Sequence, residues 1–176
     1  MYNSDTFYIT EFELEDTFSL YQFMVANKMH FRQYLPVTLS QNLSLSASEA
    51  YIIQKKKENE AKTVLTYALK EKETKEVCGL IILKNIDTLK KQGEFAFGLG
   101  EAYNGRGWMS QAVKVFSSYA FNELHLNKLQ IITHKTNIGS SKVAEKNGYI
   151  WQKTLKNEYT PPKQGPMDME LYELTL

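Results

Sequence analysis

A predicted strand, a glycine-rich loop and an amphipathic helix follow one another directly in the middle of the chain. The strand covers residues 93–100, and the loop after it contains Gly105 and Gly107. From 108 to 121 the apolar side chains recur at helical spacing and form one stripe, which is typical of a helix packed on a sheet. A strand that leads directly into such a helix is a β-α unit, and with the strands on either side of it this segment fits a mixed α/β fold.

The remaining elements follow from the same two periodicities. We expect strands at 7–12, 64–69, 77–83, 128–134, 149–155 and 167–174, and helices at 15–28, 46–62 and 140–147. Ser46 with Glu49 three residues later indicates a capping box that opens the second of these helices. The order predicts a mixed, mostly antiparallel sheet of roughly six or seven strands with helices on both faces. No linker divides the chain, so we expect one domain over 1–176.

The glycine loop is a candidate site for an anion. Glycine lets the backbone approach a ligand closely, and the first amides of a helix are unpaired and carry partial positive charge. Residues 105–110 could therefore hold a pyrophosphate, with a charge contact from Arg106. Two glycines alone are equally consistent with a simple connecting turn. The sequence has neither the GxxxxGK[ST] loop nor a GxGxxG loop with its later ribose-binding carboxylate, which argues against ATPases and dinucleotide-binding enzymes.

Composition and charge exclude several other classes. The chain has 21 Lys+Arg against 20 Asp+Glu, and Lys55 to Lys57 are followed by Glu58 and Glu60 on one predicted helix. This balance gives no reason to expect a nucleic-acid partner. No apolar run approaches the roughly 20 residues of a membrane span, and the first residues do not resemble a secretory signal. We therefore expect a cytoplasmic protein without nucleic-acid or membrane partners.

Cysteine and histidine offer little for metal or covalent chemistry. The single cysteine, Cys78, lies within the apolar run 77–83 without a basic neighbour that would activate its thiol, so we expect a core residue. The three histidines, at positions 30, 125 and 134, have no spacing suited to a shared metal ion. We predict no metal site.

Two segments resemble the conserved motifs of the GNAT superfamily of acetyltransferases. Residues 97–113 resemble its acetyl-CoA motif, and 137–149, read as NIGSSKVAEKNGY, resemble its second motif. Residues 120–128 and 167–172 resemble the branch that contains the ribosomal-protein N-terminal acetyltransferases. The resemblance implies the GNAT fold, with the sheet splayed between the strands at 93–100 and 128–134. It also implies direct transfer of the acetyl group of acetyl-CoA to a primary amine in a ternary complex.

The resemblance places the CoA site on the glycine loop and its flanks. It implies that the pantetheine arm lies beside the end of the strand at 93–100 and pairs with its backbone. Asn137 would bond the pantetheine region, although an asparagine is also common in a turn before a helix. The implied cofactor-binding residues are Leu99, Gly100, Asn104, Gly105, Arg106, Gly107, Trp108, Met109, Ser110 and Asn137.

The catalytic residues are less clearly marked. The tyrosine that protonates the leaving thiolate in many family members is replaced by Ala144. In the ribosomal-protein branch a serine at the place of Ser140 is the suggested substitute, with helix capping as its alternative role. Glu94 could accept the amine proton, or it could be a solvated residue at a strand end. An α-amine with a pKa near 8 is already roughly a tenth neutral at pH 7, so a weak base would favour a protein N-terminus over a lysine.

The acceptor side is the most open part of the prediction. By the family architecture, Phe31 and Tyr34 would form part of its wall, with core packing as the alternative, and His134 could face it or lie on the surface. A polyamine or aminoglycoside acceptor would call for an acidic pocket. Ala144 also leaves open a CoA-binding regulatory module without catalysis. Pairing through the last strands would allow a homodimer, and a monomer is equally open.

Overall fold

The computed structural model describes residues 2–161 and 165–176. Its strands are β1 (Tyr2–Asn3), β2 (Phe7–Glu11), β3 (Leu65–Glu71), β4 (Val77–Asp87), β5 (Gln92–Leu99), β6 (Lys128–Thr133), β7 (Ile150–Tyr159) and β8 (Met167–Thr175). Its helices are α1 (Thr17–Ala26), α2 (Lys28–Tyr34), α3 (Pro36–Ser40), α4 (Leu45–Glu60), α5 (Trp108–Asn122) and α6 (Ile138–Lys146). Two short 3₁₀ turns, η1 (Leu14–Asp16) and η2 (Glu101–Tyr103), precede α1 and the glycine loop.

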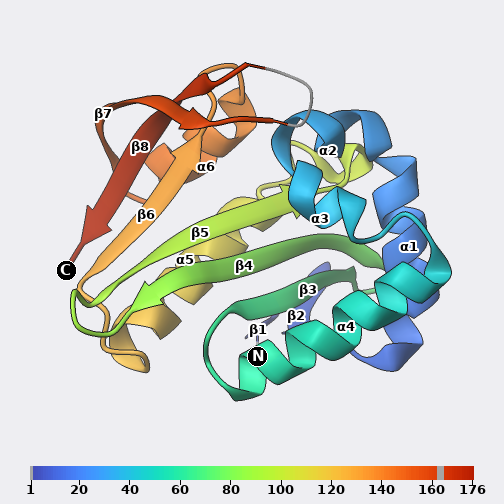
Figure 1. The fold of residues 1–176 in the computed structure, drawn as a ribbon. Coiled ribbons are helices and arrows are strands. Elements are labelled where there is room, and N and C mark those ends of the chain that lie inside the picture. The colour runs from blue at the N-terminus through green and yellow to red at the C-terminus, as the bar shows by residue number, and fades with distance from the viewer. Residues whose placement is uncertain (1, 162–164) are drawn as a thin grey trace.

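The strands form one eight-stranded sheet in the order β1-β2-β3-β4-β5-β6-β8-β7. All neighbours are antiparallel except β5 and β6, which are parallel. Helices α1 to α4 cover one face, whereas α5 and α6 cover the other (Figure 1). The predicted mixed, mostly antiparallel sheet with helices on both faces is confirmed. The strand count is higher because β1, only two residues long, gives no alternation from which it could be predicted.

Burial on both faces explains the continuous apolar run in β4. Ile81 and Leu83 belong to the core under α5, while Leu80 and Ile82 belong to the core under α1 to α4. A strand covered on both sides reads as an unbroken apolar stretch rather than an alternating one. Cys78 is fully buried in the α5 core, and burial raises the pKa of its thiol to about 12. It is a packing residue, as the sequence predicts.

The parallel strands β5 and β6 separate partway along their length. Their pairing runs from Gln92 opposite Lys128 to Phe95 opposite Ile131 and then stops. Both strands continue beyond this point, to Leu99 and Thr133, and in Figure 1 they diverge toward α2 and α6. The predicted splay is therefore confirmed. Separated strands leave backbone amides and carbonyls free to pair with an extended ligand.

Helix caps account for the differences in helix boundaries. The α4 cap is Ser44, whose Oγ accepts a hydrogen bond from the Ala47 amide at 3.2 Å, so the predicted cap at Ser46 is wrong by two residues. Ser44 has the extended backbone that a cap requires, whereas Ser46 already lies in the helix. Residues 28–40 form two short helices, which are too brief to show a sustained period.

No helix in the described ranges combines the length and apolar character that a membrane span would need. Within the same ranges, no group of three or more His, Cys, Asp or Glu side chains is arranged to hold a metal ion.

Candidate active site

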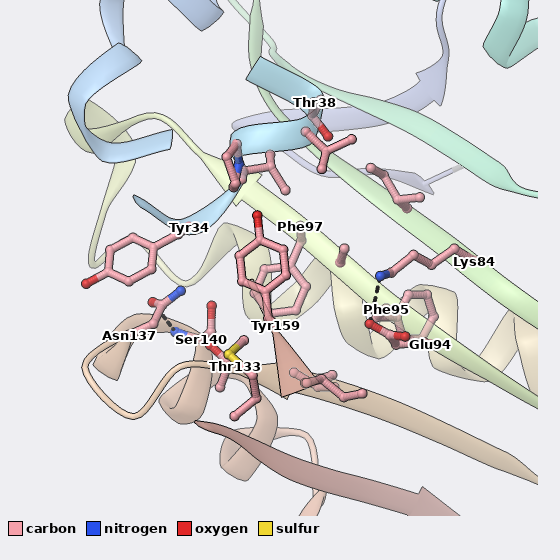
Figure 2. A pocket seen from close by; sticks show the side chains of 18 of the residues that line it. Tyr34, Thr38, Lys84, Glu94, Phe95, Phe97, Thr133, Asn137, Ser140 and Tyr159 are labelled. Atoms are coloured by element: carbon pink, nitrogen blue, oxygen red, sulfur yellow. Dashed lines mark hydrogen bonds and ion pairs between the residues drawn. The ribbon is translucent and has the colours of Figure 1, made fainter. Parts of the chain in front are cut away.

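A cavity of about 530 Å³ lies where β5 and β6 separate. The segment from Gln33 to Thr38 forms one side, and β4 and β5 contribute Ile82, Lys84 and Glu94. The end of β6, the first turn of α6 and the β7–β8 arm form the rest. Figure 2 shows Asn137, Ser140 and Tyr34 toward one end of this space and Lys84 with Glu94 toward the other. The cavity therefore opens between the separated strands and is lined by polar side chains at both ends.

The glycine loop has the backbone geometry that the sequence predicts for an anion site. Gly105 and Gly107 have φ values of +78° and +79°, in the left-handed region that favours glycine. The first helical hydrogen bond of α5 runs from the Gln111 amide to the Gly107 carbonyl at 3.0 Å. Within the described part of the chain, the amides of residues 105–110 donate to no backbone carbonyl. These unpaired groups at a helix N-terminus are suited to a phosphate.

The side chains of this loop hold the loop together. The Arg106 guanidinium lies over the rings of Tyr103 and Trp108, at 5.0 and 5.4 Å from their centroids, and donates to the Ala102 carbonyl at 3.1 Å. Trp108 is buried and stacks on Phe7 at 5.0 Å. These contacts use only one of the guanidinium donors, and Arg106 is exposed, so its charge contact with an anion stays a prediction.

Three other predicted CoA-site residues are also held by the fold. Met109 is buried in the core, and Ser110 accepts a hydrogen bond from the Asn147 side chain at 3.1 Å, which links α5 to α6. Gly100 donates its amide to the Cys78 carbonyl at 2.8 Å. The contribution of Met109 to a ligand would therefore come from its backbone amide and not from its side chain.

Asn27 fixes the segment that leads into the loop, a role that sequence reasoning missed. Its Oδ1 accepts a hydrogen bond from the Glu101 amide at 2.9 Å, and its Nδ2 donates to the Phe23 carbonyl at 2.8 Å. The end of α1 is thereby joined to the start of the glycine loop. An asparagine at a helix C-terminus is a local signal, but its partner 74 residues away is not visible in the sequence.

Asn137, rather than Ser140, caps helix α6. The Asn137 Oδ1 accepts a hydrogen bond from the Ser140 amide at 3.2 Å. The alternative role of Ser140 as a helix cap is therefore not what the structure shows. Ser140 lines the cavity from the first turn of α6, and among the described residues none accepts a hydrogen bond from its hydroxyl (Figure 2). Ala144 is fully buried in the core and adds no functional group to the cavity.

Glu94 is a buried, paired carboxylate. It lies one residue before the pairing of β5 with β6 ends, and Lys84 of β4 is its partner in the β4–β5 register. The Lys84 ammonium is 2.9 Å from Glu94 Oε1, and the Asn85 amide donates to Oε2 at 2.8 Å. The alternative of a solvated strand-end residue is wrong, because Glu94 is 9% exposed. The sequence did not single out Lys84 or Asn85, since cross-strand register is set by the hairpin fold.

Two of the three predicted acceptor residues line the cavity. Tyr34 and His134 both contact Thr136: its Oγ1 is 3.4 Å from the Tyr34 hydroxyl and 2.7 Å from Nδ1 of His134. Phe31 is 1% exposed and packs edge-on against Phe23 at 5.2 Å, so its predicted place in the acceptor wall is not met. It is a core residue because α2 turns that face toward the sheet. Further lining residues come from the β7–β8 arm, namely Glu158, Tyr159, Met167 and Met169.

A sheet opened at a parallel strand pair, next to a loop of free helix-terminal amides, gives an α/β protein a site suited to an extended, phosphate-bearing cofactor. The family described as "Acetyltransferase (GNAT) domain" matches residues 7–150. The chain therefore belongs to the GNAT acetyltransferase family.

Named relatives agree with this assignment. The chain is 31% identical over 74 residues to a putative ribosomal N-acetyltransferase, YdaF, of Bacillus subtilis. This match covers 42% of this chain and 40% of that protein. It is 30% identical over 84 residues to spermidine N(1)-acetyltransferase of Escherichia coli, covering 48% and 45%. The matches thus span less than half the length of these two curated relatives. The solved structure of RimL, a ribosomal L7/L12 α-N-protein acetyltransferase in complex with coenzyme A, has a TM-score of 0.89 at 17% identity and covers 98% of this chain and 96% of its own.

Proposed function

We propose that the protein transfers the acetyl group of acetyl-CoA directly to a primary amine, with the N-terminal α-amine of a protein as its acceptor. The observation that carries this proposal is the course of β5, which lines the cavity where it separates from β6 and ends at Leu99, where the chain enters the glycine loop. One extended thioester could bind its phosphates at the loop and present its acetyl group inside the cavity. Membership of the acetyltransferase family supports this reaction.

The cofactor would be held largely by the backbone. The amides of residues 105–110, at the positive end of the α5 dipole, would bind the pyrophosphate. The pantetheine arm would run along the free edge of β5 at Leu99 and Gly100 and would reach Asn137 across the opening. The relative solved with coenzyme A supports this cofactor class.

The transfer would need no nucleophile of the protein. The neutral amine attacks the thioester carbonyl, a C–N bond forms, and collapse of the tetrahedral intermediate breaks the C–S bond. Ser140 and Glu94 both line the cavity. In this proposal Ser140 would donate a proton to the departing thiolate, and Glu94 would take the amine proton through water. Cys78 is buried with a raised thiol pKa, which argues against an acyl-cysteine intermediate.

The charges around the cavity do not form the acidic pocket that a polyamine would favour. Lys55 and Lys84 line it together with Glu94 and Glu158, so the two signs balance. A polyamine would be attracted by an acidic pocket, which this balance does not provide. The similarity to spermidine N(1)-acetyltransferase makes a polyamine the second candidate acceptor.

The proposal is tested by measuring acetyl-CoA binding and CoA release on the same preparation. Peptides that begin with Ser or Ala should stimulate CoA release, and the same peptides with a blocked α-amine should not. Spermidine as a separate substrate distinguishes the second acceptor class. Tight CoA binding with no release in the presence of any amine would contradict the proposal and favour the regulatory-module alternative.

A further inference from the structure

We infer that Lys84 selects the acceptor by charge, because it neutralises Glu94 and so keeps dicationic amines out of the cavity. This inference rests on the proposed function, since it concerns the acceptor of the same site. It assigns a specificity role to a residue of β4 that the proposed transfer step does not itself use as acid or base. Removal of the Lys84 charge should convert the pocket from one that favours a monocation to one that favours a diamine.

The geometry makes Lys84 the direct counter-ion of the buried carboxylate. Lys84 and Glu94 are opposite one another in the β4–β5 register, and their side chains lie on the cavity side of the sheet (Figure 2). The ammonium is 2.9 Å from Oε1 of Glu94, while the neutral amide of Asn85 bonds Oε2 at 2.8 Å. Lys84 is therefore the charged member of the pair of groups that hold this carboxylate.

The two partners differ in exposure, which makes the pair suited to a selective role. The Glu94 side chain is 11% exposed, whereas that of Lys84 is 40% exposed. A desolvated carboxylate requires a nearby positive charge, because leaving it unpaired in a poorly solvated site is costly. Lys84 can be shortened or neutralised without opening the core. The second ammonium of a diamine would then take the place of the lysine.

The other charges of the lining do not compensate Glu94. Lys55 pairs with Glu58 at 2.7 Å on the same helix, and Glu158 is an exposed residue of β7. The charged lining residues are Lys55, Lys84, Glu94 and Glu158. Neutralising Lys84 leaves the positive charge of Lys55 against two carboxylates. The cavity would become acidic, because the negative charge of the buried Glu94 would have no counter-ion in the lining.

The test compares diamine binding by the CoA-saturated protein and by three variants. Calorimetry with 1,3-diaminopropane reads affinity without requiring turnover. Lys84→Gln should bind the diamine about tenfold to a hundredfold more tightly than the parent. The double variant Lys84→Gln with Glu94→Gln should lose this gain. Lys90→Gln is the matched control, because it removes the same charge from the same hairpin, where Lys90 is exposed and paired with Asp87.

The selection ratio in turnover provides a second measurement. The kcat/KM for the diamine relative to a peptide with a free α-amine should rise in Lys84→Gln and stay unchanged in Lys90→Gln. The inference is overturned if Lys84→Gln binds diamine no better than the parent, if Lys90→Gln gains as much, or if the gain persists in the double variant. Parental failure to acetylate any amine would sink the proposed function alone, since the binding comparison still decides the role of Lys84.

Discussion

Replacement of Gly107 by alanine should weaken acetyl-CoA binding through backbone strain alone. Gly107 has a φ of +79°, and a Cβ built on it meets no atom within 4 Å, so the substitution introduces no steric clash. A residue other than glycine in the left-handed region costs about 1–2 kcal/mol. If the loop relieves this strain by leaving its binding conformation, affinity should fall by about 5- to 30-fold. Calorimetric titration with acetyl-CoA measures this change.

Gly148 provides a matched control for the same strain. Its φ is also +79°, its Cβ would meet only Leu174 Cδ1 at an ordinary 3.7 Å, and it lies after α6 rather than in the loop. Gly148→Ala should lower the free energy of unfolding by a similar amount and leave acetyl-CoA affinity unchanged. Equal affinity in the parent and Gly107→Ala, or equal losses in both variants, would refute the assignment of this loop to the cofactor.

Three further predictions concern catalysis, alkaline stability and a buried ion pair. Ser140→Ala should lower kcat by about a hundredfold with little change in acetyl-CoA affinity, as measured by CoA release; an unchanged kcat would remove Ser140 as the acid. Burial raises the pKa of the Cys78 thiol to about 12, so as pH rises the thiol loses its proton in the unfolded chain before it does in the folded protein. The free energy of unfolding should therefore fall between about pH 9 and about pH 12. In Cys78→Ala, denaturant unfolding should show a smaller fall over the same pH range. Asp16→Ala should cost about 3–5 kcal/mol in denaturant unfolding, because it leaves Lys70 buried without its partner at 2.5 Å; a loss below about 1 kcal/mol would show that the pair behaves as a surface one.

The fold was predictable where local periodicity and a long-range constraint agree. The stripe of α5 and the two motifs around it place the loop, the helix and the separated strands, and the structure has each of them. The apolar run of β4 correctly predicts a strand, and its lack of alternation reflects a sheet covered on both faces. Element ends were less accurate, because caps such as Ser44 depend on the backbone conformation of a single residue.

The site could be predicted only where the chain itself brings residues together. The glycine loop is contiguous in sequence, so its backbone geometry follows from Gly105 and Gly107. The partners of Glu94 come from the register of a hairpin, and the contact of Asn27 with Glu101 spans 74 positions. Phe31 was predicted in the acceptor wall but is buried in the core. An aromatic residue in a segment without a regular apolar period gives no sign of whether it faces a ligand or the core.

The most direct test of the central claim is the position of the acetyl group on a peptide product. A peptide with a free N-terminal serine and an internal lysine is incubated with the protein and acetyl-CoA, and the product is sequenced by tandem mass spectrometry. We expect acetylation of the α-amine, with the lysine unmodified and the reaction slowed in Ser140→Ala. Acetylation of the lysine alone would contradict the proposed acceptor, and no acetylated product despite measurable acetyl-CoA binding would contradict the proposed transferase.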